Sequence, residues 1–345
     1  MDTHAFQDKL RNLLAWFLDV RSGLLDKEGA HRVREMADHI ACDYRQLGVS
    51  RIHTKKIVKI SKPVSKEYFT RDRKYREPLK KLYARVNGDL GKYITHFYLH
   101  GSLATEDYKK GWSDLDTFMV IKKEVVRDPR KLMELRKICF SAWQLFLKIT
   151  PLQHHGFLIA TEFDLESYPS HVMPPEVFDE ALSMKGGQSP LRLSLRKEHN
   201  RALELLRHRL RLAESSLKTG IFKYHPKDGV YLLSGFRNAD NNMHQLMSFL
   251  GNGANAPIYF LNALGQSCYK RDSFQRAKPY FSKRGWNLID KATKIRGLWP
   301  EKEGLRYRGN KIPFWVQKIL GKNYFEENVF LFKEAVEKAH GKKTR

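Results

Sequence analysis

Cysteine is scarce in this chain of 345 residues, where only Cys42, Cys139 and Cys268 occur, far apart and odd in number. A disulfide framework or a cysteine-based zinc site needs paired or closely spaced cysteines, so neither is encoded. Long apolar runs are also lacking, because runs such as residues 13–18 end far short of the roughly 18 residues that a membrane span needs. No basic segment followed by an apolar signal core is visible. These absences predict a protein of the reducing cytoplasm with no membrane partner.

Acidic residues are few relative to basic ones. Lys and Arg number 63 against 38 Asp and Glu, which gives a formal net charge of +25. Solubility requires a much smaller excess, so the balance favours a polyanionic partner such as nucleic acid. A basic surface that is merely solvated is the alternative. Hydrophobic residues make up 41% of the chain, which is enough for a globular protein, and the length predicts two or three compact units.

Two segments concentrate the positive charge. Residues 51–76 carry ten Lys or Arg against two acids, and residues 270–296 carry nine against two. Aromatic residues are interleaved in both segments, namely Tyr68, Phe69, Tyr75, Phe274, Tyr280, Phe281 and Trp286. Because bases stack on aromatic rings while cations follow phosphates, both segments are candidate nucleic-acid surfaces. The alternative is that most of these rings belong to the core.

Hydrophobic periodicity predicts a mixed fold. Apolar residues at helical spacing predict two helices within residues 1–50, with a break near 23–29. Short β-branched or aromatic runs predict three strands, at residues 94–99, 115–121 and 155–160. A helix is predicted before the third strand, at residues 128–147. After Pro174 the pattern is helical, most clearly over residues 194–218. The fold class predicted from this order is α+β.

One constellation carries candidate chemistry: Gly101 and Ser102 follow a predicted strand, and after eleven further residues the chain reads Asp114-Leu115-Asp116. Glycine allows a backbone approach that a Cβ would block, and Ser102 adds a hydroxyl and an N–H at the start of a helix, where anionic oxygens are favoured. On an extended chain the two aspartates point to one side and Leu115 to the other. Two carboxylates held so close repel each other unless a cation lies between them, and magnesium prefers carboxylate oxygens together with substrate phosphates. The pattern indicates metal-assisted nucleotidyl transfer, and two solvated aspartates at the entry of a strand are the alternative.

These residues resemble the signature of the nucleotidyltransferase superfamily that shares the DNA polymerase beta palm fold. That signature is a Gly-Ser or Gly-Gly turn, a spacer of similar length, and an acid-hydrophobic-acid triplet on a strand. The resemblance covers residues 94–160, under a third of the chain, and assigns no closer subfamily. It implies a palm, a mixed sheet with helices, which we place at residues 66–180. A helical extension (residues 1–65) would precede the palm, and an all-helical domain (residues 181–345) would wall the nucleotide cleft.

The resemblance also implies a reaction and its site. A nucleoside monophosphate would pass from a nucleoside triphosphate to an acceptor, with release of pyrophosphate. Asp114 and Asp116 would be the catalytic carboxylates and would hold one or two Mg²⁺ or Mn²⁺ ions. Gly101 and Ser102 would bind the triphosphate.

Two further roles depend on looser correspondences. Where the family places a third carboxylate, this chain has His155, whose ordinary pKa of about 6.5 would suit a base that accepts a proton from an attacking hydroxyl. Glu162 or Asp164 could reach in instead, or the site could be degenerate. Lys270 loosely resembles a lysine with which relatives contact the nucleotide phosphates, and an ordinary surface lysine is the alternative.

The acceptor is inferred from charge. A triphosphate engages about three or four cations at most, so the surplus favours an RNA end as the acceptor. A small molecule, a nucleotide and a protein hydroxyl are alternative acceptors, and a degenerate palm that only binds RNA is the alternative to an enzyme. Arg237, Asn238 and His244 match a motif of RNA-cleaving helical domains, but Arg201 and His208 show the same spacing within a predicted helix.

Overall fold

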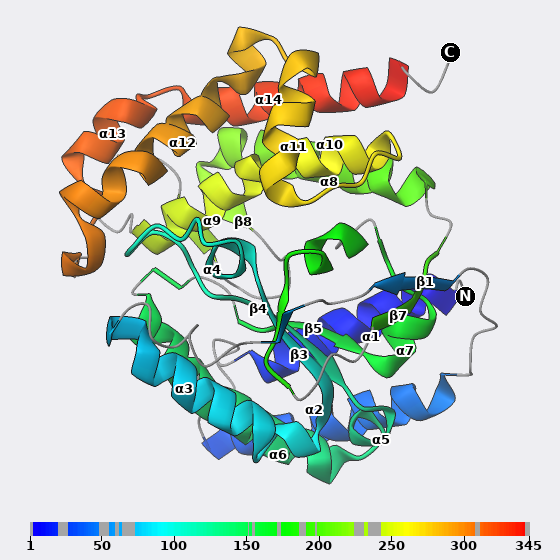
Figure 1. Ribbon diagram of the computed structural model, residues 1–345. Helices are drawn as coiled ribbons and strands as arrows, with labels where there is room; N and C mark the ends of the chain where they lie inside the picture. The colour runs from blue at the N-terminus through cyan, green and yellow to red at the C-terminus, as the bar shows by residue number, and fades with distance from the viewer. Residues whose placement is uncertain are drawn as a thin grey trace.

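A five-stranded mixed sheet lies at the centre of the molecule (Figure 1). The computed structural model describes residues 3–19, 27–47, 55–58, 62–63, 73–150, 152–153, 156–170, 174–185, 191–196, 199–223, 231–233, 243–307 and 311–341. The sheet has the strand order β2-β6-β3-β4-β5, with β3 antiparallel to β4 and β6, and β4 parallel to β5. Its strands are β2 (Lys62–Pro63), β3 (Ile94–His100), β4 (Asp116–Ile121), β5 (Leu158–Thr161) and β6 (Leu182–Ser183). All three predicted strands are present, and β5 begins later than predicted.

Both faces of the sheet are apolar. Leu99 and Met119 lie in a buried cluster on one face, whereas Tyr98 and Phe118 lie in a second cluster on the other face. Successive side chains of a strand point to opposite faces, so each apolar face has to be covered by another layer.

Helices from the first half of the chain cover one face, and α2, α3 and α6 lie below the sheet in Figure 1. The elements on this side are α1 (Thr3–Leu18), α2 (Lys27–Gln46), α3 (Arg73–Asn87), η2 (Leu90–Lys92), α5 (Lys123–Val126) and α6 (Pro129–Ile149). The start of α6 is set by Asp128, whose carboxylate accepts the Arg130 N–H at 2.9 Å, and by Pro129 in the first turn. The two predicted N-terminal helices are present, but their apolar side chains belong to the same core as the sheet.

Shorter elements cover the other face. They are α7 (Glu162–Glu166), η3 (Pro175–Phe178) and a two-stranded sheet of β1 (Lys55–Val58) and β7 (Leu191–Ser194). The ring of Phe178 packs edge-on against Phe118, with centroids 4.9 Å apart. Strands β6 and β7 both follow residue 180, so the sheet and its cover extend beyond the boundary predicted for the palm.

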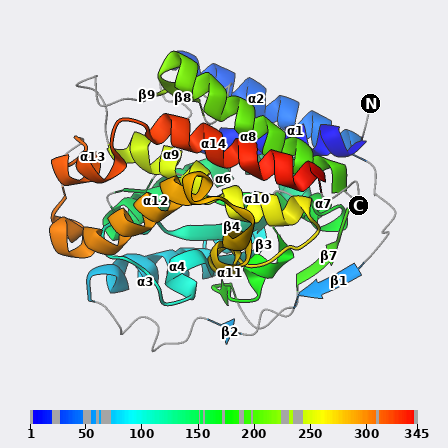
Figure 2. The same ribbon diagram turned by 90° about the horizontal axis from the view of Figure 1, so that it is seen from above.

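The C-terminal helices form a layer above the sheet in Figure 1, and α8 and α14 lie side by side in Figures 1 and 2. This layer contains α8 (His199–Thr219), α9 (Met243–Ala254), α10 (Ala256–Ala263), α11 (Lys270–Ala277), η4 (Lys278–Tyr280), α12 (Lys283–Lys302), η5 (Gly304–Arg306), α13 (Phe314–Leu320) and α14 (Tyr324–Gly341). A hairpin of β8 (Ile221–Lys223) and β9 (Tyr231–Leu233) interrupts the helices, so this region is not all-helical as expected. The fold is α+β with helical regions on both sides of the palm, as the sequence predicts.

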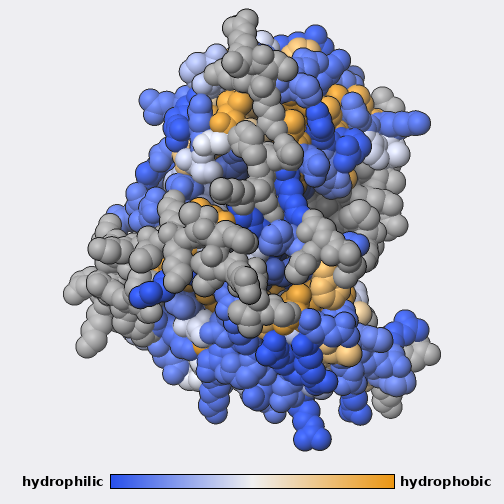
Figure 3. All heavy atoms as spheres, turned by 90° about the vertical axis from the view of Figure 1, so that its right-hand side faces the viewer, coloured by the Kyte–Doolittle hydropathy of each residue, from blue (hydrophilic) through white to orange (hydrophobic). Residues whose placement is uncertain are grey.

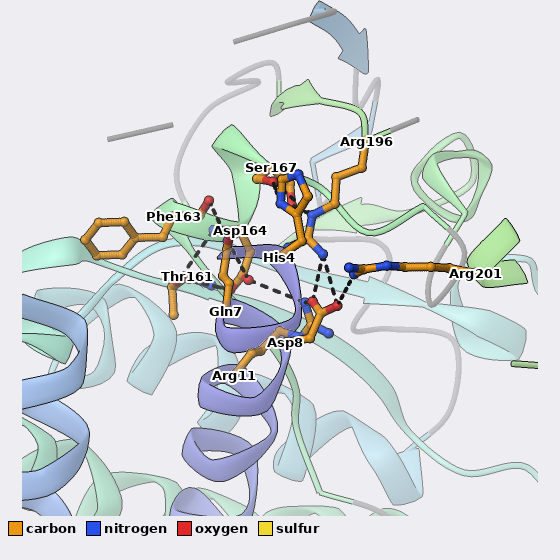
Figure 4. A network of polar contacts seen from close by, with 10 residues as sticks. All are labelled: His4, Gln7, Asp8, Arg11, Thr161, Phe163, Asp164, Ser167, Arg196 and Arg201. Atoms are coloured by element: carbon orange, nitrogen blue, oxygen red, sulfur yellow. Dashed lines mark hydrogen bonds and ion pairs between the residues drawn. The ribbon is translucent and has the colours of Figure 1, made fainter. Parts of the chain in front are cut away.

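A buried polar network joins α1 to the rest of the molecule (Figure 4). The Asp8 carboxylate accepts hydrogen bonds from Arg11 and Arg196 at 3.0 Å and from Arg201 of α8 at 3.1 Å. Arg11 also donates to the Asp164 carboxylate of α7 at 3.4 Å. Because burial makes an unpaired charge costly, these contacts fix α1 against both the palm and α8.

Among the described helices, none combines the length and the hydrophobicity that crossing a membrane requires. In the space-filling view of Figure 3, hydrophilic residues dominate the lower part of the face that is shown.

Candidate active site

The Gly-Ser turn lies directly against the second aspartate. His100, the last residue of β3, pairs with Asp116, the first residue of β4. Gly101 then has φ of +67°, and a Cβ at this position would overlap the Oδ2 oxygen of Asp116. The single-turn helix α4 (Gly101–Ala104) follows. Only glycine suits this position, because it tolerates both the left-handed backbone and the close approach of the carboxylate.

The aspartates share one side of the chain, as the sequence predicts. Leu115 is fully buried in the core beneath the sheet, whereas Asp114 and Asp116 are partly exposed. The structure brings the Asp116 carboxylate against Gly101, and Asp114 lies two residues before Asp116 at the same end of the sheet. That Ser102 and Asp114 share this site stays a prediction.

The Gln153 side chain holds the backbone of Leu115, between the two aspartates. The sequence did not indicate this contact. Gln153 Oε1 accepts the Leu115 N–H at 2.8 Å, and its Nε2 donates to the Leu115 carbonyl oxygen at 3.3 Å. An isolated glutamine between two predicted elements carries no sequence signal for such a contact.

The alternatives to His155 lie at the wrong end of the sheet. His155 itself lies outside the described residues. Strand β5 runs parallel to β4 and its last residue, Thr161, pairs with Ile121. Glu162 and Asp164 follow Thr161, about 16 Å from the Asp116 end of β4 at the usual rise of a strand. Both predicted alternatives are therefore wrong.

Their contacts give Glu162 and Asp164 a role in the fold. Glu162 Oε2 accepts the Lys123 N–H at 2.8 Å, and Asp164, which is 1% exposed, forms the capping box of α7 with Thr161.

An acid from the N-terminal helix approaches the start of β5. The Cγ atom of Asp19, which directly follows α1, lies 3.7 Å from where a Cβ on Gly156 would be. Extending the register of β4 and β5 by two residues places Gly156 opposite Asp116. The sequence does not reveal this approach, because it depends on how α1 packs along the edge of the sheet.

The C-terminal layer contributes Tyr269 to the site. This residue precedes α11, is 8% exposed, and its side chain forms a hydrogen bond with Thr105, just after α4. Burial, followed by the charge of Asp116, raises the pKa of Tyr269 to about 12. Lys270, the first residue of α11, is exposed next to it.

The spacer between the turn and the aspartates is anchored on α12. Arg296 donates to the Asp107 carboxylate at 2.8 Å, and the Trp112 ring packs against Trp299 with centroids 5.3 Å apart. Gly111 has φ of +76°, and a Cβ there would overlap the carbonyl oxygen of Gly304. The C-terminal layer therefore holds the spacer as well as the turn.

Part of the positive charge of the basic segment at residues 270–296 is paired with acids of this chain. Several of its cations form ion pairs with acids, namely Arg271 with Glu180, Lys278 with Asp290, Lys291 with Glu327 and Arg296 with Asp107. Its rings pack in or against the apolar core of the C-terminal layer, namely Phe274, Tyr280, Phe281 and Trp286. Core packing, the stated alternative, therefore holds for the buried Trp286, whereas Phe274, Tyr280 and Phe281 are half-buried and stacking of bases on them stays a prediction. The segment at residues 51–76 lies mostly outside the described residues.

The RNA-cleaving motif receives no support. Arg237 and Asn238 lie outside the described residues. Arg201 and His208 show the same spacing as the motif. Arg201 donates to Asp8 in the network of Figure 4, which is a structural role.

The donor set fits a hard divalent cation. Two carboxylates that lie beside a glycine turn can bind Mg²⁺ or Mn²⁺, because such ions commonly take one or two protein carboxylates and complete their shell with phosphate oxygens and water. Within the described part of the chain, no group of three or more His, Cys, Asp or Glu side chains could hold a metal ion by itself. The two aspartates would supply one or two of the ligands of such a cation.

One of the comparisons with known proteins, that with family models, agrees with this geometry. No curated protein and no solved structure gives a significant match to the chain. Residues 79–149, which include Gly101, Ser102, Asp114 and Asp116, match the family model described as the nucleotidyltransferase domain. This match is consistent with the resemblance of the same residues to the superfamily that shares the DNA polymerase beta palm fold.

Proposed function

We propose that this protein is a metal-dependent nucleotidyltransferase that moves a nucleoside monophosphate from a nucleoside triphosphate to the end of an RNA. The carrying observation is the contact of Gly101 with the Asp116 carboxylate, because it puts a backbone that can approach phosphate beside a pair of acids. The transfer chemistry follows from the family, and the metal and the acceptor are our inference.

Each residue at the site has a role in this reaction. Asp114 and Asp116 would hold the cation, and a bound cation would supply positive charge against the phosphates during attack at the α-phosphate with loss of pyrophosphate. Gly101 and Ser102 offer backbone and hydroxyl hydrogen bonds to the triphosphate, and Lys270 adds a positive charge near it. His155 accepts the proton of the attacking hydroxyl.

The RNA acceptor is supported by the net charge of +25, which exceeds what one triphosphate can use. Exposed cations remain on the C-terminal layer, including Lys270, Lys283 and Lys294. A cytoplasmic protein would meet both nucleoside triphosphates and RNA. Nucleotide, small-molecule and protein acceptors are the outcomes that the same experiment separates.

The test is an incubation of the full chain with each labelled nucleoside triphosphate and Mg²⁺, with and without total RNA. We expect label on RNA, and loss of at least about 100-fold of this activity in an Asp114→Ala, Asp116→Ala double variant, because removing ligands of a catalytic metal removes most of the rate. Label that survives the double variant would place the metal site elsewhere, and label on a soluble product or on protein would change the acceptor. A His155→Ala variant that keeps the full rate would remove the base from the proposal.

A further inference from the structure

The Gln153 amide pairs with the backbone of Leu115, between the two aspartates, as a neighbouring strand would. The pairs between β4 and β5 begin at Phe118 and Leu158, and the pairs between β3 and β4 end at His100 and Asp116. Leu115 therefore lies just outside the ladder. Gln153 gives it, from one side chain, the acceptor for its N–H and the donor for its carbonyl that a neighbouring strand would supply.

These two hydrogen bonds are protected from water. Gln153 is 3% exposed and Leu115 is fully buried. A buried amide or peptide that loses its partner keeps the full cost of desolvation, so the two groups constrain each other strongly. Because side chains alternate along an extended chain, the orientation of the Leu115 peptide sets the directions of both Asp114 and Asp116.

Gln153 is itself anchored from the C-terminal layer. Its neighbour Leu152 is fully buried in an apolar cluster together with Trp112 and with Trp299 of α12. Trp112 lies two residues before Asp114. The same cluster therefore fixes the chain on both sides of the contact, at Leu152 before Gln153 and at Trp112 before the aspartates.

We propose that Gln153 is a positioning residue for nucleotidyl transfer. By holding the Leu115 peptide it keeps the carboxylates of Asp114 and Asp116 aimed at a common point, where they bind a divalent cation. The inference rests on the proposed function and deepens it. Gln153 touches neither the substrate nor the cation and acts through the two aspartates.

The test measures Mn²⁺ binding to the full chain by electron paramagnetic resonance, alongside the rate of transfer. Gln153→Met keeps the length of the side chain and removes both hydrogen bonds, and Gln153→Asn keeps the amide but shortens its reach. Residues that orient metal ligands typically account for about 10- to 100-fold in metal affinity or activity, so we expect a loss of that size in both variants. The KM for the nucleotide should change by less than the kcat, because the triphosphate contacts at Gly101 remain.

Gln7→Met is the matched control. Gln7 is also a buried glutamine, and its Nε2 donates to the Phe163 carbonyl oxygen at 2.9 Å, beyond the far end of β5. Gln7 Nε2 also donates to the Asp164 carboxylate at 3.2 Å, so this variant, like Gln153→Met, removes two buried hydrogen bonds. It should lower stability while leaving Mn²⁺ affinity within about threefold of wild type.

The outcomes separate the inference from the function. A folded Gln153 variant that binds Mn²⁺ within about threefold of wild type overturns the inference. Unfolding of both Gln153 variants assigns the amide to the fold and overturns it as well. If the wild-type chain binds no Mn²⁺ and transfers no label, the proposed function itself is wrong.

Discussion

At the scale of single residues, the geometry of the candidate site depends on the absence of a Cβ at Gly101. Gly101 combines a positive φ with a carboxylate in the space where a Cβ would be. An L-residue in the left-handed region costs about 1–2 kcal/mol, and any side chain here must also push Asp116 away. The missing Cβ that permits the turn therefore also leaves room for the Asp116 carboxylate.

We predict that Gly101→Ala lowers transfer activity by at least about 100-fold while lowering the free energy of unfolding by about 1–2 kcal/mol. Activity falls further than stability because displacement of Asp116 by even one ångström disturbs the reacting geometry. Label transfer and urea unfolding measure the two effects.

Gly297→Ala is the control for this prediction. Gly297 lies in α12, and a Cβ there would have no atom within 4 Å. Alanine should stabilise that helix slightly and leave activity unchanged. Equal activity of the two variants would show that the turn has no part in the reaction.

At the scale of elements, α1 acts as a connector rather than as an extension. Through Asp8 and Arg11 it contacts α7, Arg196 and α8, as Figure 4 shows. The Asp164 carboxylate is the centre of the palm side of this network, because it caps α7 and accepts hydrogen bonds from Gln7 and Arg11. Loss of Asp164 would leave the buried Arg11 short of a partner.

We predict that Asp164→Ala lowers the free energy of unfolding by about 3–5 kcal/mol, the usual cost of breaking a buried ion pair from one side. Denaturant unfolding measures this cost. Asp128→Ala is the matched variant, because Asp128 also caps a helix but lacks a buried ionic partner, and it should cost about 1 kcal/mol. Similar costs for the two variants would mean that the network adds nothing beyond the cap.

At the scale of the whole molecule, only part of the positive charge that the structure describes is free of ion pairs and exposed to solvent. Part of it is neutralised within the fold by pairs such as Lys291 with Glu327 and Arg296 with Asp107. Other cations of the described residues are exposed, as at Lys283 and Lys294 of α12. Only the exposed part can bind a polyanion, so the net charge alone overstates the surface available to RNA.

We predict that binding of single-stranded RNA weakens steeply between about 50 and 200 mM salt, because bound phosphates release counterions. A Lys283→Glu, Lys294→Glu double variant should weaken binding about tenfold and reduce the slope of log affinity against log salt by about 1.4. Filter binding over a salt series measures both quantities.

The control for this prediction reverses two lysines on the opposite side of the sheet. Lys137 and Lys148 are exposed on α6, and Lys137→Glu with Lys148→Glu makes the same change in net charge. An equal loss in this control would mean that RNA senses only the total charge. A flat salt response would remove RNA as the acceptor.

The sequence by itself determined the main elements and the nucleotidyltransferase match. Short β-branched or aromatic runs predicted β3 and β4, and helical periodicity predicted α6, because these patterns are local. Gly101, Asp114 and Asp116 could be proposed as site residues because the proposal depends on backbone conformation and on spacing along one strand. The predicted limits of the palm were less successful, because β6 and α1 join its sheet and core through contacts between distant segments.

Only the tertiary structure decided which other residues reach the site. Three side chains from distant segments lie near the aspartates, namely Gln153, Tyr269 and Asp19. Their spacing along the chain does not connect them to the aspartates. The structure also rules out Glu162 and Asp164 as site residues. Strand β5 runs parallel to β4, so the residues that follow β5 lie at the end of the sheet opposite Asp116. Periodicity records which face a side chain occupies, whereas the partner on that face is fixed only when the layers pack.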